Sequence, residues 1–132
     1  MKKLLLVVFS SVFLFGCTSS DDDSASNNSF NPPSWIQGRW LEESKTFGYK
    51  FSTNNVCLIS SSTDACFKES MDVYNGTQII TSVNEEIKSD TEYKFSYTIQ
   101  SMTQYFHFVK VSNTEIKDEK NDPNGYNLYT KQ

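Results

Sequence analysis

The chain has 132 residues, a length that suits one small domain. It contains 12 basic and 16 acidic residues, so its formal net charge is −4. Nucleic-acid-binding surfaces are basic and clustered, and this composition excludes that class of partner.

The first sixteen residues differ from the rest of the chain. Lys2 and Lys3 precede an apolar run over residues 4–15, which is broken only by two serines. As a helix, the twelve residues of this run would span about 18 Å, too little for a hydrocarbon core of about 30 Å. The pattern predicts a signal peptide over residues 1–16 and not a transmembrane helix. Its cleavage would lower the 12 basic residues to 10 against 16 acidic ones, a net charge of −6.

Leu14-Phe15-Gly16-Cys17 ends the apolar run and resembles the lipobox of bacterial lipoproteins. In that family an aliphatic residue lies three positions before the cysteine and a small residue lies directly before it. Leu14, Gly16 and Cys17 match, whereas Phe15 departs from the usual small or β-branched residue. The resemblance implies that Cys17 carries lipid chains that hold the protein on a membrane, each buried methylene contributing about 0.8 kcal/mol. An ordinary secretory signal with a chance cysteine is the alternative.

Residues 17–33 are expected to form the lipidated cysteine and a disordered tether, because they are rich in Ser, Asn and Asp and poor in apolar residues. Within them, Ser20, Asp21, Asp22 and Asp23 resemble the acidic export signal of Bacteroidetes surface lipoproteins. This resemblance implies attachment to the outer membrane with the protein on the cell surface. The periplasmic face is the alternative, because Ser and Asp are common in any solvated tether.

The residue pattern over positions 34–132 is typical of a folded β domain. Between positions 93 and 99, aromatic and aliphatic residues alternate with polar ones, as in a half-buried strand. The expected strands lie near residues 38–44, 46–52, 55–60, 64–70, 77–87, 91–101, 103–111, 114–119 and 126–131. Short strands with hairpin-length links predict an all-β fold, either a small antiparallel up-and-down barrel or a sandwich of eight to nine strands. Residues 83–88 could instead form a helical turn, because two adjacent glutamates are poor strand formers.

Cys57 and Cys66 remain as a pair once Cys17 is assigned to the lipid. In an exported protein a disulfide is the default interpretation, and facing residues of an antiparallel hairpin lie at a suitable distance. A zinc site is the alternative, but it would need further ligands, and His107 is the sole histidine. We therefore predict a stabilising disulfide and no metal or cofactor.

Gly38-Arg39-Trp40 resembles the Gly-X-Trp start of lipocalins, and the opening of residues 35–40 resembles lipocalin-like domains of small Bacteroidetes lipoproteins. The resemblance implies a lipocalin-like barrel over residues 34–132. Gly38 would ease the start of the first strand, and Trp40 would close the barrel base. Lipocalins usually place an arginine near the last strand over this tryptophan; here Lys131 is the nearest substitute. A generic sandwich with a buried Trp40 is the alternative.

No hydrolase elbow, phosphate loop or dinucleotide fingerprint occurs in the sequence, so we do not expect an enzyme. A catalytic role for His107 would require polar groups that converge around it in a cleft. Asp118, Glu119 and Asp122 flank a turn and could attract calcium, although their spacing fits a solvated turn better. The stretch from Tyr105 to Phe108 carries aromatic residues on both faces of one strand, so either one set lies outside the core or the barrel is covered there.

Two functions are consistent with these features. The first is a lipid-anchored envelope lipoprotein, expected to be monomeric, whose small barrel binds a small apolar ligand or a glycan. The second is a structural or protein-interaction surface lipoprotein with a filled core and no ligand. An internal cavity would separate them, because ligand pockets usually enclose about 300–1,000 Å³.

Overall fold

The structure is a computed structural model that describes residues 29–120 and 127–132. It is almost entirely built from antiparallel β-strands, which confirms the predicted all-β class. The described elements, in chain order, are β1 (Gly38–Leu41), β2 (Gly48–Phe51), β3 (Val56–Ile59), β4 (Asp64–Cys66), α1 (Phe67–Tyr74), β5 (Thr81–Lys88), β6 (Glu92–Ile99), β7 (Met102–Lys110), β8 (Glu115–Asp118) and β9 (Asn127–Lys131). No helix within the described ranges is long and apolar enough to cross a membrane.

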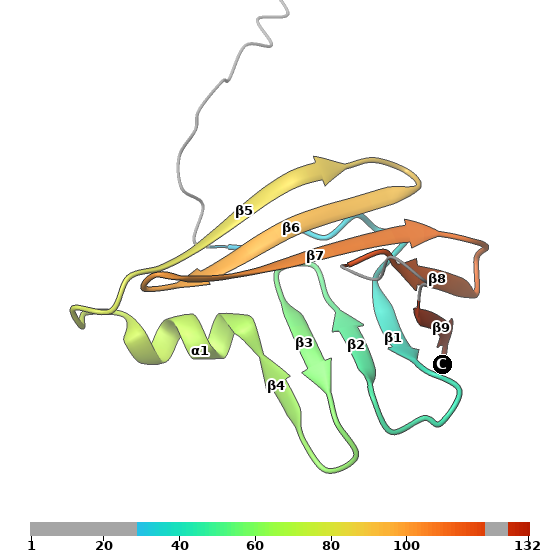
Figure 1. Cartoon of the computed structure of the whole chain (residues 1–132), viewed down its shortest axis with the longest axis horizontal. Helices are drawn as coiled ribbons and strands as arrows, with labels where there is room; N and C mark the ends of the chain where they lie inside the picture. Colours follow the sequence, from blue (N-terminus) through green and yellow to red (C-terminus); the bar gives the residue numbers. More distant parts are fainter. Residues whose placement is uncertain (1–28, 121–126) are drawn as a thin grey trace, which may run out of the picture.

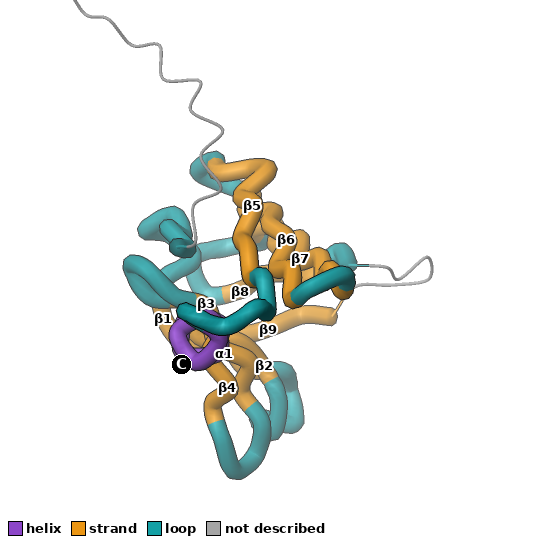
Figure 2. Tube along the Cα trace, turned by 90° about the vertical axis from the view of Figure 1, so that its left-hand side faces the viewer, coloured by secondary structure: helices purple, strands orange, loops and turns teal. Residues whose placement is uncertain are grey.

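The described strands form one curled sheet in the order β4-β3-β2-β1-β9-β8-β7-β6-β5. Strands that follow one another in the sequence pair with each other, except β4 and β5, and β1 pairs with β9 to join β1–β4 to β5–β9. β4 and β5 are the two edges of this sheet, so it is an up-and-down half-barrel and not a sandwich of two sheets. Figure 1 shows the long strands β5–β7 on one side, the short strands β1–β4 on the other, and α1 beside β4. In the view turned by 90°, α1 is seen end-on (Figure 2).

The helix α1 corrects the strand predicted over residues 64–70, of which only the first three residues are extended. Its own N-cap residue, Cys66, makes no side-chain capping bond. Asn55 supplies the cap instead: its Oδ1 accepts the backbone N–H of Lys68 at 3.0 Å, and its amide donates to Glu69 at 2.7 Å. The first N–H groups of a helix need such an acceptor. Because Asn55 is remote in the sequence, no local signal indicated this helix.

The strand β5 also differs from its prediction. It begins at Thr81, four residues later than the range 77–87 predicted, and residues 83–88 are extended rather than helical. A register shift between Glu85 and Ile87 marks a β-bulge, which inserts one extra residue into the strand. Because the bulge interrupts the regular alternation of side chains between the two faces, the strand can contain two adjacent glutamates.

The two glutamates at the bulge have separate partners. Glu85 accepts hydrogen bonds from the Tyr93 hydroxyl at 2.7 Å and from the backbone N–H of Asn31 at 2.8 Å. Glu86 forms an ion pair with Lys94 at 2.7 Å. The Tyr93 hydroxyl is buried beside a carboxylate, and this burial, with the hydrogen bond to Glu85, raises the pKa of Tyr93. Tyr93 therefore stays neutral and acts as a hydrogen-bond donor.

The packed domain begins before residue 34, which corrects the C-terminal end of the predicted tether at 17–33. Phe30 is only 1% exposed, and its ring lies 5.3 Å from that of Phe95 and 5.8 Å from that of Phe67. Pro32 is also fully buried. An aromatic ring supplies the apolar surface that the polar part of the tether lacks, so this end of the segment packs into the half-barrel.

Aromatic side chains fill the inner face of the sheet. Tyr49 and Phe108 meet edge to face with ring centroids 4.7 Å apart, and Phe95 and Phe106 stack at 4.8 Å. Such rings bury about 150–250 Å² each and dominate the energetics of a small core. The buried aromatic residues of this core are Phe30, Trp40, Tyr49, Phe51, Phe67, Tyr93, Phe95, Tyr97, Phe106, Phe108 and Tyr129. Space that could hold an internal ligand in a larger barrel is occupied here by side chains.

Gly38 and Trp40 lie where β1 meets β9. Trp40 is completely buried, and its indole N–H donates to the backbone carbonyl of Ile36 at 2.6 Å. The Lys131 ammonium lies over the indole, 5.0 Å from the ring centroid, in the position that the sequence analysis assigned to a substitute for arginine. Gly38 adopts φ +128°, and a Cβ there would lie 2.9 Å from Lys131 Cε. The positive φ makes glycine the favoured residue at this position, whereas the flexible end of the Lys131 side chain could move away from a Cβ.

Candidate functional site

The two faces of β7 carry different aromatic side chains. Phe106 and Phe108 point into the core and are buried, whereas Tyr105 points outward with 53% of its surface exposed. Period-two alternation explains this split, because successive side chains of a strand point to opposite faces. Of the two alternatives in the sequence analysis, the one with aromatics outside the core is present, and Tyr105 is that residue.

A pocket of about 310 Å³ opens beside Tyr105 on the outer face of the sheet. We call it the Tyr105 site; its lining residues are Lys94, Tyr105, Phe106, His107, Glu119 and Lys120. They come from β6, β7 and the residues directly after β8. Antiparallel register places Lys94 directly opposite His107 and Ser96 opposite Tyr105, so side chains distant in the sequence meet on one surface.

Short polar side chains continue the face of the Tyr105 site along β5, β6 and β7. Asn84 pairs with Ser96, which in turn pairs with Tyr105, so these three residues form one row across the sheet. In the next row, the hydroxyls of Thr98 and Thr103 lie 2.9 Å apart. The exposed tyrosine is thus surrounded by hydroxyl and amide groups, which can both donate and accept hydrogen bonds.

His107 forms one wall of the site between two carboxylates. Its Nε2 lies 2.5 Å from Glu92 Oε1, and its Nδ1 lies 3.7 Å from Glu119 Oε2. Glu119 also pairs with Lys117, and the hydrogen bond from that ammonium lowers the pKa of the Glu119 carboxyl below its usual range. Polar groups therefore do converge at His107, but each ring nitrogen faces a carboxylate. The histidine links β6 to the end of β8 and presents neither nitrogen to a molecule in the pocket.

The two lysines that line the site differ in their surroundings. Lys94 is paired with Glu86 at 2.7 Å, and this hydrogen bond raises the pKa of its ammonium group. Lys120 lies with its Nζ 4.7 Å from the centroid of the Phe106 ring. Among the described residues, no carboxylate lies within 4 Å of the Lys120 ammonium.

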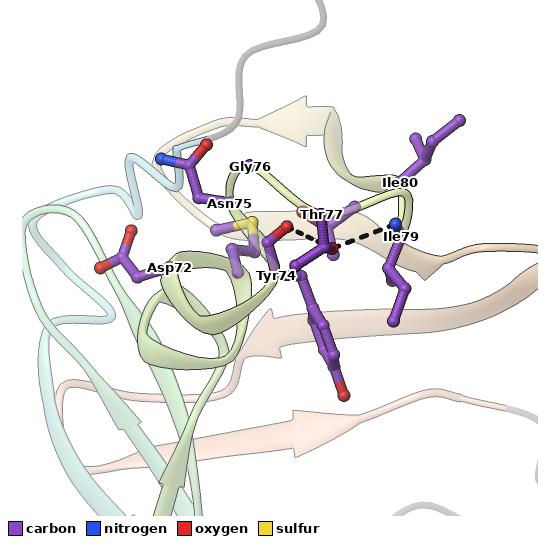
Figure 3. Close-up of a pocket in the computed structure, with 9 residues that line it drawn as sticks. Asp72, Tyr74, Asn75, Gly76, Thr77, Ile79 and Ile80 are labelled. Carbon is purple, nitrogen blue, oxygen red and sulfur yellow. Dashed lines mark hydrogen bonds between the residues drawn. The ribbon is translucent and has the colours of Figure 1, made fainter.

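A second pocket, of about 300 Å³, lies at the C-terminal end of α1 and in the link to β5 (Figure 3). The link is shaped by Thr77, whose hydroxyl donates to the Tyr74 carbonyl at 2.6 Å and accepts the N–H of Ile79 at 3.1 Å. Figure 3 shows Tyr74 and Ile79 pointing to one side of the link and Ile80 to the other. Gly76 has φ +78° in the turn that links α1 to β5.

The predicted disulfide between Cys57 and Cys66 is present. The two residues face each other across β3 and β4, with Cα atoms 3.9 Å apart. Cys57 also lies opposite the exposed Lys50, so the disulfide is on the outer face of the sheet. It lies at the β4 edge, on strands that do not contribute to the Tyr105 site. The disulfide therefore holds an edge of the fold and takes no part in the site.

Of the three carboxylates considered for calcium, the two that the structure describes, Asp118 and Glu119, have different partners. Asp118 is buried and accepts hydrogen bonds from the Tyr49 hydroxyl at 3.0 Å and the Lys120 N–H at 2.9 Å, whereas Glu119 faces His107. In the part of the chain that the structure describes, no group of three or more His, Cys, Asp or Glu residues could hold a metal ion. Asp122, the predicted lipid-attachment residue Cys17 and the predicted export residues Ser20–Asp23 lie outside the described residues.

Sequence reasoning indicated Tyr105 and His107 as noteworthy but did not associate Lys94, Glu119 and Lys120 with them. Strand pairing and the chain beyond β8 bring these charges together. Comparisons with protein-family models, curated proteins and solved structures find no match for this chain. The geometry of the Tyr105 site and the sequence motifs are therefore the basis of the function proposed below.

Proposed function

We propose that this chain is a lipid-anchored lipoprotein of the cell envelope that binds a glycan at the Tyr105 site. The observation that supports this ligand class is an exposed tyrosine ring on the outer face of the sheet, with hydroxyl, amide and charged side chains around it. The lipid anchor at Cys17 is supported by the lipobox resemblance of Leu14–Cys17, and the outer-membrane location by the resemblance of Ser20–Asp23 to an export signal.

The inner face of the sheet favours the glycan over the small apolar ligand. An apolar ligand needs a dry cavity lined by apolar groups. Here the ring of Phe30 enters from the N-terminal segment and meets the rings of Phe67, Phe95 and Tyr97. Since these side chains occupy the space between α1 and the sheet, a ligand of drug size would have to displace part of the core.

A saccharide matches the chemistry of the outer face. Sugar rings have a face of C–H groups, which pack on an aromatic ring, and an edge of hydroxyl groups, which need hydrogen-bond partners. Tyr105 offers such a ring with a polar hydroxyl, and its neighbours Asn84, Thr98 and Thr103 offer donors and acceptors. Such sites bind through a wet, polar surface, so bridging waters add to direct contacts.

The binding proposal is tested with the Tyr105→Ala variant. A panel of immobilised neutral and acidic oligosaccharides should contain ligands for the full chain. This variant should lose about fivefold or more in affinity, since stacking on an aromatic side chain typically contributes about 1 kcal/mol or more. Tyr105→Phe, which keeps the ring, should retain most of the binding. Val111→Ala removes another exposed apolar side chain near the end of the same strand and serves as the matched control. Retention of all binding by Tyr105→Ala would reject the site.

The anchoring proposal has a separate test. Cys17→Ser should move the protein from the membrane fraction to the soluble fraction or block its maturation, because one thiol carries the lipid. Replacing Asp21, Asp22 and Asp23 by alanine should reduce cleavage by protease added to intact cells, while membrane attachment is retained. Unchanged fractionation of Cys17→Ser would refute the lipid anchor. Unchanged protease cleavage of the triple alanine variant would refute only the proposed export signal.

A protein partner is the second candidate, and a specific observation favours it. Val73, Ile80 and Met102 are 74%, 73% and 69% exposed, respectively. Ile80 and Met102 lie at the same end of the long strands, since the Ile80 carbonyl accepts the N–H of Gln100 in the β6–β7 turn. If this end binds a protein, replacing Ile80 and Met102 by serine should abolish co-purification of that protein from envelope extracts and leave saccharide binding intact. Co-purification of the same protein by the double variant would exclude this candidate.

A further inference from the structure

The charges at the Tyr105 site are unequal. Its described lining residues include two lysines, Lys94 and Lys120, and one carboxylate, that of Glu119. The chain as a whole is acidic, with a formal net charge of −4, so a locally basic pocket runs against the overall balance. With His107 neutral, the lining carries a formal charge of +1.

Most of the nearby charges are already paired. Glu119 is held by Lys117 and faces His107, whose other nitrogen contacts Glu92. Lys94 is held by Glu86 at 2.7 Å. These pairs fix the walls of the pocket and leave little of their charge to attract a ligand, since an ion pair compensates both partners.

Lys120 differs from these groups. Its ammonium packs over the ring of buried Phe106 at 4.7 Å, a cation–π contact that holds the charge at the pocket without neutralising it. Its backbone N–H is fixed by Asp118 at 2.9 Å, which positions the start of the side chain. An ammonium has three donors, and no acceptor for them occurs among the described residues. The ammonium and the exposed Tyr105 side chain thus line one pocket, and among the described residues this ammonium has no hydrogen-bond acceptor.

We infer that the Tyr105 site selects an acidic saccharide, with a sugar ring on Tyr105 and the sugar's anionic group on Lys120. This inference rests on the proposed function and names the ligand class of the same site. A sugar carboxylate lies on the rim of the ring, next to its hydroxyls, so one residue can stack and pair at once. Charge-assisted hydrogen bonds are about twice as strong as neutral ones, so the lysine discriminates an acid from its uncharged analogue.

The experiment compares two probes that differ only in charge. Oligogalacturonate and its fully methyl-esterified form share the same rings and hydroxyls, and binding of each to the full chain in detergent is measured by calorimetry. We expect the acid to bind at least about fivefold more tightly than the ester, in line with one charge-assisted contact at a partly exposed site. The preference should weaken as salt is raised, because the Debye length falls from about 10 Å at 0.1 M to about 3 Å at 1 M.

Two variants assign the preference to Lys120. Lys120→Gln should bind acid and ester equally, at the affinity the native chain shows for the ester. Lys50→Gln, which removes an exposed lysine from β2 on another part of the sheet, should keep the preference. Equal binding of acid and ester by the native chain, or a preference that survives Lys120→Gln, would overturn the inference.

The outcomes separate this inference from the proposed function. If both probes bind equally and Tyr105→Ala abolishes both, the glycan site stands and the acidic preference is wrong. If neither probe nor any saccharide of the neutral and acidic panel binds, the proposed function itself fails. A third arm uses inorganic phosphate alone: displacement of the acid by millimolar phosphate, with binding unchanged in Tyr105→Ala, would identify a simple anion site and reject the sugar.

Discussion

The inner and outer faces of the same sheet use aromatic residues in opposite ways. On the inner face, Phe95, Phe106 and Phe108 are buried against one another and supply the apolar area that holds the domain together. On the outer face of β7, Tyr105 contributes little to that area and is half-exposed. The neighbouring residues Tyr105 and Phe106 therefore have different environments, one exposed and one buried, because successive side chains of a strand point in opposite directions.

The comparison shows which face stabilises the domain and which face is left to the proposed recognition. A core of large rings has little room to change, since interiors are close-packed and lose several kcal/mol when a ring is removed. The outer face is held by ion pairs, hydroxyl contacts and one disulfide, so its side chains can vary with little cost to the fold. Recognition can then be altered on the outside while the inside remains fixed.

The largest effect should come from breaking the inner face. Phe95→Ala removes a fully buried ring from the centre of β6 and should lower the free energy of unfolding by about 3–5 kcal/mol. Urea unfolding followed by tyrosine and tryptophan fluorescence measures this change. Phe95→Leu, which leaves a smaller cavity, keeps the effect measurable if the alanine variant does not fold. Tyr105→Ala is the outer-face control and should change stability by less than about 0.5 kcal/mol; an equal loss in Tyr105→Ala would end the distinction between the faces.

The disulfide is the strongest single stabilising link expected on the outer face. Replacing both Cys57 and Cys66 by serine should lower the free energy of unfolding by about 2.5–3 kcal/mol, the loop-closure contribution for a loop of about ten residues. Reduction of the native protein with a thiol should lower its thermal midpoint by about as many degrees as the double substitution does. Saccharide binding should persist under conditions where the domain stays folded, because β3 and β4 do not line the Tyr105 site. Loss of binding in the folded double variant would contradict the separation.

The cap of α1 gives a smaller effect at the open edge of the half-barrel. Asn55→Ala removes the acceptor for the Lys68 N–H and the donor to Glu69, and should cost about 1–2 kcal/mol. The hydrogen bond from Asn55 lowers the pKa of Glu69, so its contribution to stability is present above the unfolded carboxyl pKa of about 4.3 and is lost as the pH falls through the lower folded value. Native protein should therefore lose more stability between about pH 5 and pH 3 than Asn55→Ala does. Identical pH profiles would show that this bond contributes nothing.

The smallest effect concerns the charge over the buried indole. Lys131→Ala removes the cation from Trp40 and should lower the free energy of unfolding by about 0.5–1 kcal/mol. Lys131→Arg should preserve the native value, because a guanidinium stacks on an aromatic face at least as well as an ammonium. Thermal unfolding monitored by tryptophan fluorescence distinguishes the two variants. A full loss of stability in Lys131→Arg would show that the lysine acts through packing around Gly38 and not through its charge.

Much of the fold was predictable from local pattern. Alternation around Tyr93–Ile99 predicted a half-buried strand, and the structure has β6 there with the aromatic side inward. The spacing of Cys57 and Cys66 predicted a disulfide between facing strands, which is present. These features are encoded by neighbours in the sequence, because a period of two residues assigns each side chain to a face.

Other features depended on contacts between remote residues. The first residues of α1 were predicted as a strand because the residue that caps the helix, Asn55, lies in the link between β2 and β3. The position of Phe30 could not be predicted from a polar segment, since its partners Phe67 and Phe95 are brought together only when the sheet and α1 have packed. The Tyr105 site likewise requires β6, β7 and the end of β8 to lie side by side.

By itself, the sequence determined that this protein is an all-β domain with a disulfide between Cys57 and Cys66, and it is the source of the lipid-anchor proposal at Cys17. Tertiary structure alone decided that the barrel is half-open, that aromatic rings fill its inner face, and that Lys120 lies beside Tyr105. The physical reason is the range of the interactions. Alternation and hairpin pairing act between residues close in the chain. The packing of aromatic rings, the capping of a helix by a remote residue and the grouping of charged side chains exist only after distant strands have paired.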